Sequence, residues 1–399
     1  MWSALQHLAF RWLFASSLAS LAGSKIHRVA LLFVAYQETQ NAVWVSLILG
    51  AQFLASAVLG PLLGPLSDRY DRRALMIVSN LARAALVACI PLFAIGSMPL
   101  LMGISFLMAV FESVHYAASN SAIPDMVPES ALDSANGLMM FVQRFSEIAF
   151  VALAGTLVAA VGPVPAFWIN ALSYLIAAGL LIFLPMLSGK AGKGNYFQAV
   201  AEGIRPLWQN PVLSRTIGTL ALAAAFGSVE GALGIVYALG ALKIGVQGFG
   251  VLEALMAAGA VLGLWVTMPL IKRWTREVVF VRSLALWGLV FASLGLFPNP
   301  IWAGVATLLM GLLNTMFIVP ARSIIQLSAP AELRGRIMAA FGATMQSAVL
   351  LGTLLAGLLE PRLGVLTVLW LLGFTVFLVV FTVILRGGIP HPTVESTRA

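Results

Sequence analysis

Charge is scarce in this sequence, and cysteine is nearly absent. Only 10% of the 399 residues are Asp, Glu, Lys or Arg, whereas soluble domains carry about 25%. The chain is 60% hydrophobic with a mean hydropathy of +0.98, so a soluble protein of this composition could not cover its surface with polar groups. The single cysteine, Cys89, excludes an intramolecular disulfide and a cysteine metal cluster. A cytosolic enzyme is therefore excluded, and the chain must face lipid.

Long apolar segments fill most of the chain. A helix needs about 20 apolar residues to cross the hydrocarbon core of a bilayer, so 399 residues leave room for about a dozen crossings and little else. Hydropathy and the Gly and Pro punctuation predict twelve membrane-spanning helices. They cover about 11–36, 42–66, 74–96, 98–121, 136–161, 164–187, 212–238, 248–271, 278–297, 300–325, 336–360 and 364–386.

One segment, 188–211, interrupts this pattern. It is rich in glycine and lysine and holds a short amphipathic stretch near 197–208. We therefore expect an N-terminal six-helix half at 1–187 and a cytoplasmic linker at 188–211. A C-terminal six-helix half follows at 212–399 and ends in a short cytoplasmic tail.

The two halves match each other at an offset of 202 residues. The matching positions are Ser121 with Ser323, Pro128 with Pro330, Ala154-Gly155 with Ala356-Gly357, and Gly162 with Gly364. This offset and the six-plus-six layout indicate a parallel duplication. The predicted fold class is an all-α membrane protein, with twelve transmembrane helices in two six-helix halves related by a pseudo-two-fold axis. Such halves place a substrate site between them, near the bilayer midplane.

Basic residues gather in the loops on one side of the membrane. Because cytoplasmic loops are the richer in Lys and Arg, both termini are predicted to lie in the cytoplasm, in a multi-pass protein of a bacterial inner membrane. The net charge of +8 then reflects topology, and no nucleic-acid partner is expected. The opposite loops carry only Lys243 and Arg362. The basic loops carry Arg69, Arg72, Arg73, Lys190, Lys193, Arg205, Lys272, Arg273, Arg276, Arg334 and Arg336.

The loop after the second predicted helix carries a motif. Its sequence is Gly60-Pro-Leu-Leu-Gly64-Pro-Leu-Ser-Asp68-Arg69-Tyr-Asp71-Arg72-Arg73. It resembles the signature of the major facilitator superfamily between helices 2 and 3. Asp71 stands where the family usually has a second glycine, a departure that looks common in branches similar to macrolide and siderophore exporters. The resemblance implies a gating cluster that locks the outward-facing state, formed by Gly64, Asp68, Arg69, Arg72 and Arg73.

Further segments bear on this resemblance. The run Val319-Pro-Ala-Arg322-Ser323 after helix 10 is similar to a pattern of the same exporter branch, and Ala118-Ser-Asn120-Ser121 is the related run after helix 4. We read both runs as structural or gating. Helix 5 departs from the antiporter pattern, because Ala149 to Gly155 stands where antiporters carry Gly-Pro-x-x-Gly-Gly. The resemblance also implies a monomer in which helices 1, 4, 7 and 10 line a central cavity.

Several ionisable side chains fall inside predicted membrane helices, where each costs at least about 2.5–3.5 kcal/mol to insert. Glu112, His115 and Tyr116 share one face of helix 4 because they stand at i, i+3 and i+4. Arg28 and Glu230 stand 202 residues apart, and we expect them to face one another across the cavity in one conformational state. The candidates for substrate binding or proton coupling are Lys25, His27, Arg28, Glu112, His115, Tyr116 and Glu230.

Four other charged positions have structural readings. Arg144 and Glu147 lie one turn apart on helix 5 and are expected to form a structural ion pair. Arg83 in helix 3 is expected to snorkel toward the membrane interface or to join the loop of Asp68. Glu253 is expected at the interface, near the outer end of helix 8.

These observations favour a secondary active transporter that exports a small amphiphilic molecule, such as a drug or a siderophore-like metabolite, by proton-coupled alternating access. No Walker motif is present, so the proton gradient, and no cofactor or metal, is expected to supply the energy. The expected partners are a small-molecule substrate and the lipid bilayer. One alternative is uptake or facilitated movement of an anionic metabolite or lipid, which Lys25 and Arg28 would suit. An intramembrane enzyme is a remote alternative, since no catalytic constellation is visible.

Overall fold

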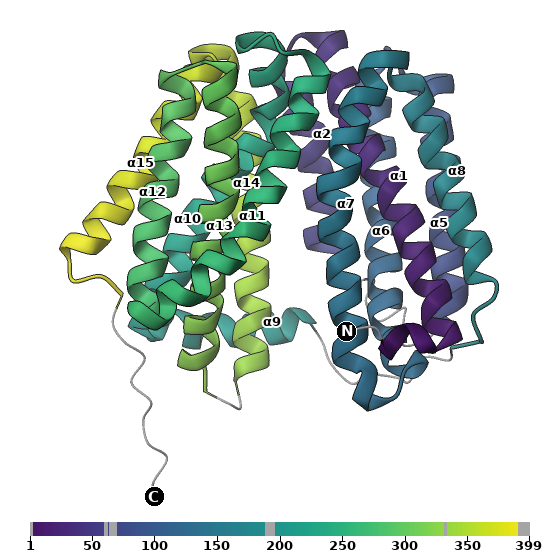
Figure 1. Ribbon diagram of the computed structural model, residues 1–399, viewed down its shortest axis with the longest axis horizontal. Helices are drawn as coiled ribbons and strands as arrows, with labels where there is room; N and C mark the ends of the chain where they lie inside the picture. Colours follow the sequence, from purple (N-terminus) through teal and green to yellow (C-terminus); the bar gives the residue numbers. More distant parts are fainter. Residues whose placement is uncertain (1–2, 60–62, 64–69, 188–195, 331–332, 390–399) are drawn as a thin grey trace, which may run out of the picture. The chain divides into compact units, whose positions relative to one another are not determined.

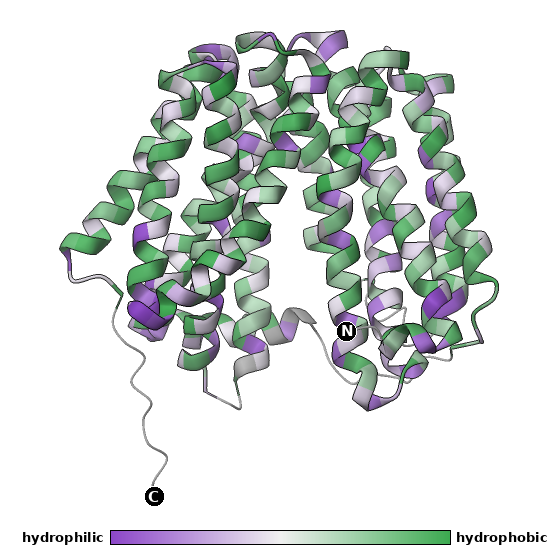
Figure 2. Cartoon of the chain, in the orientation of Figure 1, coloured by the Kyte–Doolittle hydropathy of each residue, from purple (hydrophilic) through white to green (hydrophobic). Residues whose placement is uncertain are grey.

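The structure is a computed structural model that describes residues 3–59, 63, 70–187, 196–330 and 333–389 (Figure 1). Within these ranges, twelve helices are long and apolar enough to cross a membrane, and no strand occurs. Hydrophobic residues run along the whole length of the helices (Figure 2). In lipid every backbone polar group must find an internal partner, and a helix achieves this within one segment. The prediction of an all-α membrane protein is confirmed.

The chain divides into two compact units. Unit 1 comprises Met1–Lys193 together with Ile244–Ala254, and unit 2 comprises Gly194–Lys243 together with Leu255–Ala399. The sequence-based boundaries of the two halves and of the linker stay predictions.

Unit 1 is a helix bundle. Within it, α1 packs against α7 and α8, α5 packs against α6 and α8, and α2 packs against α6. Two of its helices end in π-helical turns, namely η2 (Ala55–Leu59) after α2 and η3 (Ile90–Ala94) after α5. The helices are α1 (Leu8–Thr39), α2 (Ala42–Leu54), α5 (Arg72–Cys89), α6 (Met98–Met126), α7 (Leu132–Val161) and α8 (Pro163–Leu181).

Unit 2 repeats this arrangement. Within it, α12 packs against α13 and α15, α10 packs against α13 and α14, and the amphipathic α9 lies on α14. The first residues of α11, up to Ala254, belong to unit 1. The helices are α9 (Tyr196–Gln209), α10 (Pro211–Val236, followed by η5, Tyr237–Ala241), α11 (Gly245–Arg273), α12 (Arg276–Leu296), α13 (Pro300–Ser328), α14 (Arg334–Leu363) and α15 (Val365–Leu385).

The helix bounds reproduce the offset of 202 residues that the sequence shows. Moving α6 and α7 along the chain by this offset gives the bounds of α13 and α14. The turns that follow α7 and α14 also have the same backbone conformation, because Gly162 has a φ of 80° and Gly364 a φ of 76°. Glycine adopts this left-handed backbone without a steric penalty. The duplication therefore extends to the details of the turns.

Small residues let neighbouring helices approach closely. A Cβ added to Gly352 on α14 would lie only 1.7 Å from the carbonyl oxygen of Ala225 on α10. In unit 1, a Cβ at Gly23 on α1 would lie 1.9 Å from the Oγ of Ser173 on α8. Membrane helices associate through such backbone contacts, since lipid supplies no hydrophobic force between them.

Candidate functional site

Unit 1 contains a cavity of about 370 Å³ between α1, α5, α6 and α7. The three residues expected on one face of the fourth membrane helix, Glu112, His115 and Tyr116, all lie in its wall. Tyr116 is 58% exposed, whereas His115 is buried. We call this space the unit 1 cavity, and its wall includes Ser24, Arg83, Glu112, His115, Asn120 and Gln143.

Arg83 on α5 belongs to this wall. It was expected either to snorkel toward the interface or to join the loop of Asp68, which lies outside the described residues. The side chain is only 3% exposed. Its guanidinium lies 4.4 Å from the ring centroid of Tyr174 on α8, and its Nη2 donates to the Oδ1 of Asn80 at 2.6 Å. Stacking on an aromatic face and a hydrogen bond are both ways to hold a buried guanidinium. The expectation that Arg83 snorkels is therefore wrong, and the unit 1 cavity holds groups of both charge signs, Arg83 and Glu112.

The two histidines have different surroundings. His115 lines the unit 1 cavity, and its Nδ1 has no hydrogen-bond partner among the described residues. His27 is also buried, but its ring packs edge-on against Phe167 on α8 at a centroid distance of 5.4 Å. His27 is absent from the lining of the unit 1 cavity. Only His115 therefore lies where it could exchange a proton with Glu112 or with a ligand in this cavity.

The two cations of α1 have acidic neighbours on other helices. The Nζ of Lys25 lies 3.5 Å from the Oε1 of Glu147 on α7. The Nη2 of Arg28 lies 3.9 Å from the Oε2 of Glu253, in the part of α11 that belongs to unit 1. The side chain of Glu253 is only 15% exposed, and its expected interfacial position stays a prediction. The approach of α11 is possible because Gly155 and Gly250 face each other, and a Cβ on Gly155 would lie 2.8 Å from the Val246 carbonyl oxygen.

Two of the expected pairings, those of Arg144 and Glu230, stay predictions. The side chain of Arg144 lies outside the described part of the structure, so its ion pair with Glu147 stays a prediction. Glu230 is half-buried on α10 in unit 2. The expected meeting of Arg28 with Glu230 concerns two different units and also stays a prediction.

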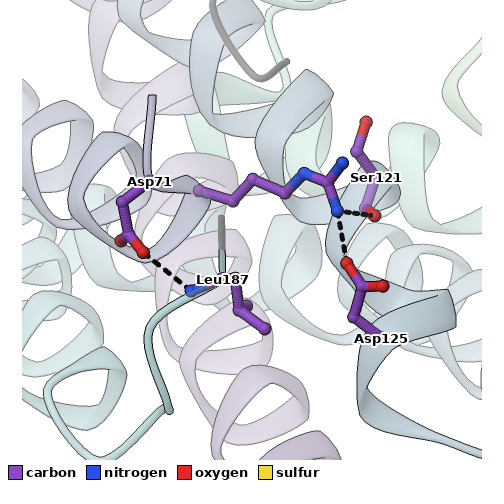
Figure 3. A network of polar contacts seen from close by, with 5 residues as sticks. Asp71, Ser121, Asp125 and Leu187 are labelled. Atoms are coloured by element: carbon purple, nitrogen blue, oxygen red, sulfur yellow. Dashed lines mark hydrogen bonds and ion pairs between the residues drawn. The ribbon is translucent and has the colours of Figure 1, made fainter. Parts of the chain in front are cut away.

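A second polar cluster lies where α5 begins (Figure 3). The buried Arg72 donates from Nη1 to the carbonyl oxygen of Ser121 at 2.9 Å and forms an ion pair with Asp125, both on α6. Asp71 caps α5, since its Oδ1 accepts from the Ala74 N–H at 2.7 Å. Its Oδ2 accepts from the Leu187 N–H, also at 2.7 Å. The start of α5 is thus tied both to α6 and to the segment after α8.

This cluster explains the departure from the family signature. A glycine at position 71 has no side chain to accept from the Ala74 and Leu187 N–H groups, whereas the Asp71 carboxylate accepts from both. The half-buried Arg73 follows on the first turn of α5. The other residues of the expected gating cluster, Gly64, Asp68 and Arg69, lie outside the described residues.

The comparisons with known proteins agree with this architecture. The family model of the Major Facilitator Superfamily matches residues 13–353. This chain belongs to the major facilitator superfamily. It is 26% identical over 373 residues to macrolide efflux protein A of Streptococcus pyogenes, covering 90% of this chain and 91% of that protein. It is also 26% identical over 373 residues to the multidrug efflux pump Tap of Mycobacterium tuberculosis, covering 89% and 88%.

Solved transporter structures share the fold. The crystal structure of a point mutant of the nucleoside transporter NupG superposes with a TM-score of 0.80 at 11% identity, covering 94% of this chain and 99% of that one. The predicted resemblance to the exporter branch, the twelve-helix fold and the assignment as a transporter and not an enzyme are confirmed. The chain is a multi-pass membrane protein.

Sequence reasoning missed three residues of these clusters. Arg83 was read as structural because its depth in α5 does not show which neighbour it meets. Asp71 was seen only as part of the motif after the second helix, and Asp125 was given no role of its own. The capping signal was nevertheless present, since an aspartate directly before an apolar-periodic segment predicts the start of a helix.

Proposed function

We propose that this major facilitator protein exports a small amphiphilic molecule across a bacterial inner membrane and takes its energy from the proton gradient. Both termini would then lie in the cytoplasm, as the placement of Lys and Arg predicts. Two relatives, a macrolide efflux protein and a multidrug efflux pump, support export and an amphiphilic substrate.

One observation carries the proton coupling. Glu112 and the buried His115 lie in the wall of one cavity together with the buried cation Arg83. A carboxylate next to a cation has two stable arrangements, since it is held by the cation when ionised and released when protonated. If the two arrangements belong to different conformations, proton binding and conformation are coupled. Ionisable groups at membrane depth are costly and mark proton relays and substrate pathways.

Everted membrane vesicles provide the test. A pH-sensitive dye reports proton release from the vesicles when a substrate is added, and the panel contains ethidium, erythromycin and an aromatic carboxylate. Glu112→Gln keeps the size of the side chain and removes its charge, so the substrate-triggered signal is expected to fall to background. Glu230→Gln tests the second expected protonation site. Glu129→Gln changes an exposed carboxylate outside the cavity and should behave as wild type.

The result that contradicts proton coupling is also defined. If the substrate crosses the membrane without a pH response, in wild type and in Glu112→Gln alike, the protein is a facilitator. The two cations on one face of α1, Lys25 and Arg28, would then favour movement of an anionic metabolite or lipid.

A further inference from the structure

Unit 2 contains a cavity of its own, of about 500 Å³, between α10, α12, α13 and α14. It lies at the position that corresponds to the unit 1 cavity. Glu112 and Asn120 line the first cavity, and Asn314 and Arg322, 202 residues further along, line the second. The duplication has therefore produced one cavity in each unit, and the side chains at matching positions have diverged.

The divergence gives the unit 2 cavity an aromatic lining, formed by Trp287, Phe317 and Phe341. The residue that matches His115 is Phe317, which is 4% exposed. Its ring stands edge-on to the Trp287 indole at a centroid distance of 6.1 Å, and the buried Phe341 completes the aromatic lining. Gly227 on α10 faces the indole, since a Cβ there would lie in van der Waals contact, 3.4 Å from the Cη2 of Trp287. Aromatic surfaces of this kind pack well against a flat ring.

The lining of the same cavity also contains a cation, Arg322. Arg322 is exposed and is the one charged residue of the lining, which contains no carboxylate. No described residue forms an ion pair or hydrogen bond with its guanidinium. The lining also includes Asn314 and Gln346, whose side-chain amides can donate hydrogen bonds. A guanidinium that shares a cavity with amide donors is suited to a carboxylate, which accepts two parallel hydrogen bonds from arginine.

We propose that the unit 2 cavity binds the aromatic part of the transported molecule, and that this part carries an anionic group held by Arg322. The inference rests on the proposed function, and it names the substrate class as aromatic anions. A volume of about 500 Å³ lies within the usual range for small-molecule sites. The two units then have different roles. Glu112 and His115 in the unit 1 cavity bind the coupling proton, and the unit 2 cavity recognises the aromatic ring and the negative charge of the substrate.

Equilibrium binding to the purified full chain tests this, because it needs no membrane gradient. The probe is radiolabelled 2-naphthoate, and the competitors are the neutral 2-naphthamide and the cationic 2-naphthyltrimethylammonium. We expect naphthoate to bind about tenfold more tightly than either competitor, the difference that one charge-assisted hydrogen-bonded pair gives. Arg322→Gln should remove this preference, and Arg322→Lys should keep part of it. Arg276→Gln, an exposed arginine at the start of α12 and outside the cavity, should leave it unchanged.

A further variant tests the role of the aromatic lining. Phe317→Leu keeps an apolar side chain and removes the ring, so all three probes should weaken by a similar factor. The proposal is overturned if naphthoate does not bind wild type, if the cation binds as well as the anion, or if Arg322→Gln keeps the preference.

The proposed export function is judged separately, by the vesicle experiment with ethidium, erythromycin and an aromatic carboxylate. Proton-coupled flux without naphthoate binding would overturn the aromatic-anion site alone. Naphthoate binding that depends on Arg322, without any proton-coupled flux, would support the site and overturn proton-coupled export.

Discussion

Replacing Asp71 with alanine removes two hydrogen bonds from the start of α5. One carboxylate oxygen caps the helix at the Ala74 N–H, and the other holds the Leu187 N–H. Loss of an N-cap costs about 1 kcal/mol, and a hydrogen bond to a charged group contributes about 1.5–3 kcal/mol. Because Asp71 is only half-buried, the lower end applies. We therefore expect Asp71→Ala to destabilise unit 1 by about 2 kcal/mol.

The only cysteine provides the assay. Cys89 is half-buried at the last residue of the same helix, α5. A thiol-reactive dye that fluoresces on reaction therefore reports the opening of this helix during a thermal scan. For a unit of this size, a loss of about 2 kcal/mol lowers Tm by about 4–8 °C.

Three variants and a control separate the two bonds. Asp71→Asn keeps one oxygen for the cap and loses the second carboxylate oxygen, so its Tm should fall by about half as much. Asp71→Gly restores the residue usual in the family and should lie between asparagine and alanine, since glycine is a tolerated N-cap. Glu129→Ala removes an exposed carboxylate near the same end of unit 1 and should leave Tm unchanged. If the Tm of Asp71→Ala lies within about 1 °C of the wild-type Tm, the two hydrogen bonds of Asp71 do not stabilise unit 1 and this interpretation of the cluster is refuted.

Two further predictions concern helix packing. In a double-mutant cycle, Arg72→Ala and Asp125→Ala should show a coupling energy of about 1 kcal/mol in the same thermal scan, because the pair joins a buried guanidinium to a half-exposed carboxylate; additive losses would contradict the ion pair. Gly352→Ala should destabilise unit 2 by about 1–3 kcal/mol through overpacking against the Ala225 carbonyl oxygen. Thermal loss of helix, followed by circular dichroism, measures this effect. Gly335 lies on the same helix, but a Cβ there would meet nothing within 4 Å, so Gly335→Ala should not destabilise unit 2.

Helix positions followed closely from the sequence, because hydropathy is a sum of local terms. The predicted spans 98–121 and 300–325 correspond to α6 and α13, which begin at Met98 and Pro300. Both helices continue past the predicted end, to Met126 and Ser328. Their last turns contain polar residues that lower the hydropathy but can leave the membrane while the helix continues. The predicted bounds are therefore wrong mainly at the helix ends, where the chain can leave the membrane and remain helical.

Pairing between helices could be predicted only in part. The spacing of Glu112, His115 and Tyr116 placed them on one face, and the structure shows that this face lines a cavity. The sequence could not tell that Arg28 would meet Glu253, because α1 and α11 are distant in the chain. The start of α11 reaches unit 1 through a close contact of Gly250 with Gly155 on a third helix, α7.

The sequence by itself determined the membrane setting, the twelve helices and the duplication, since these depend on composition and on periodic patterns along the chain. The offset of 202 residues was visible there, but its consequence was not. Only the tertiary structure showed that matching positions such as Asn120 and Arg322 line two cavities of different chemistry. The physical reason is that a cavity is formed by side chains from several helices, and its charge and shape depend on which of them face the same space.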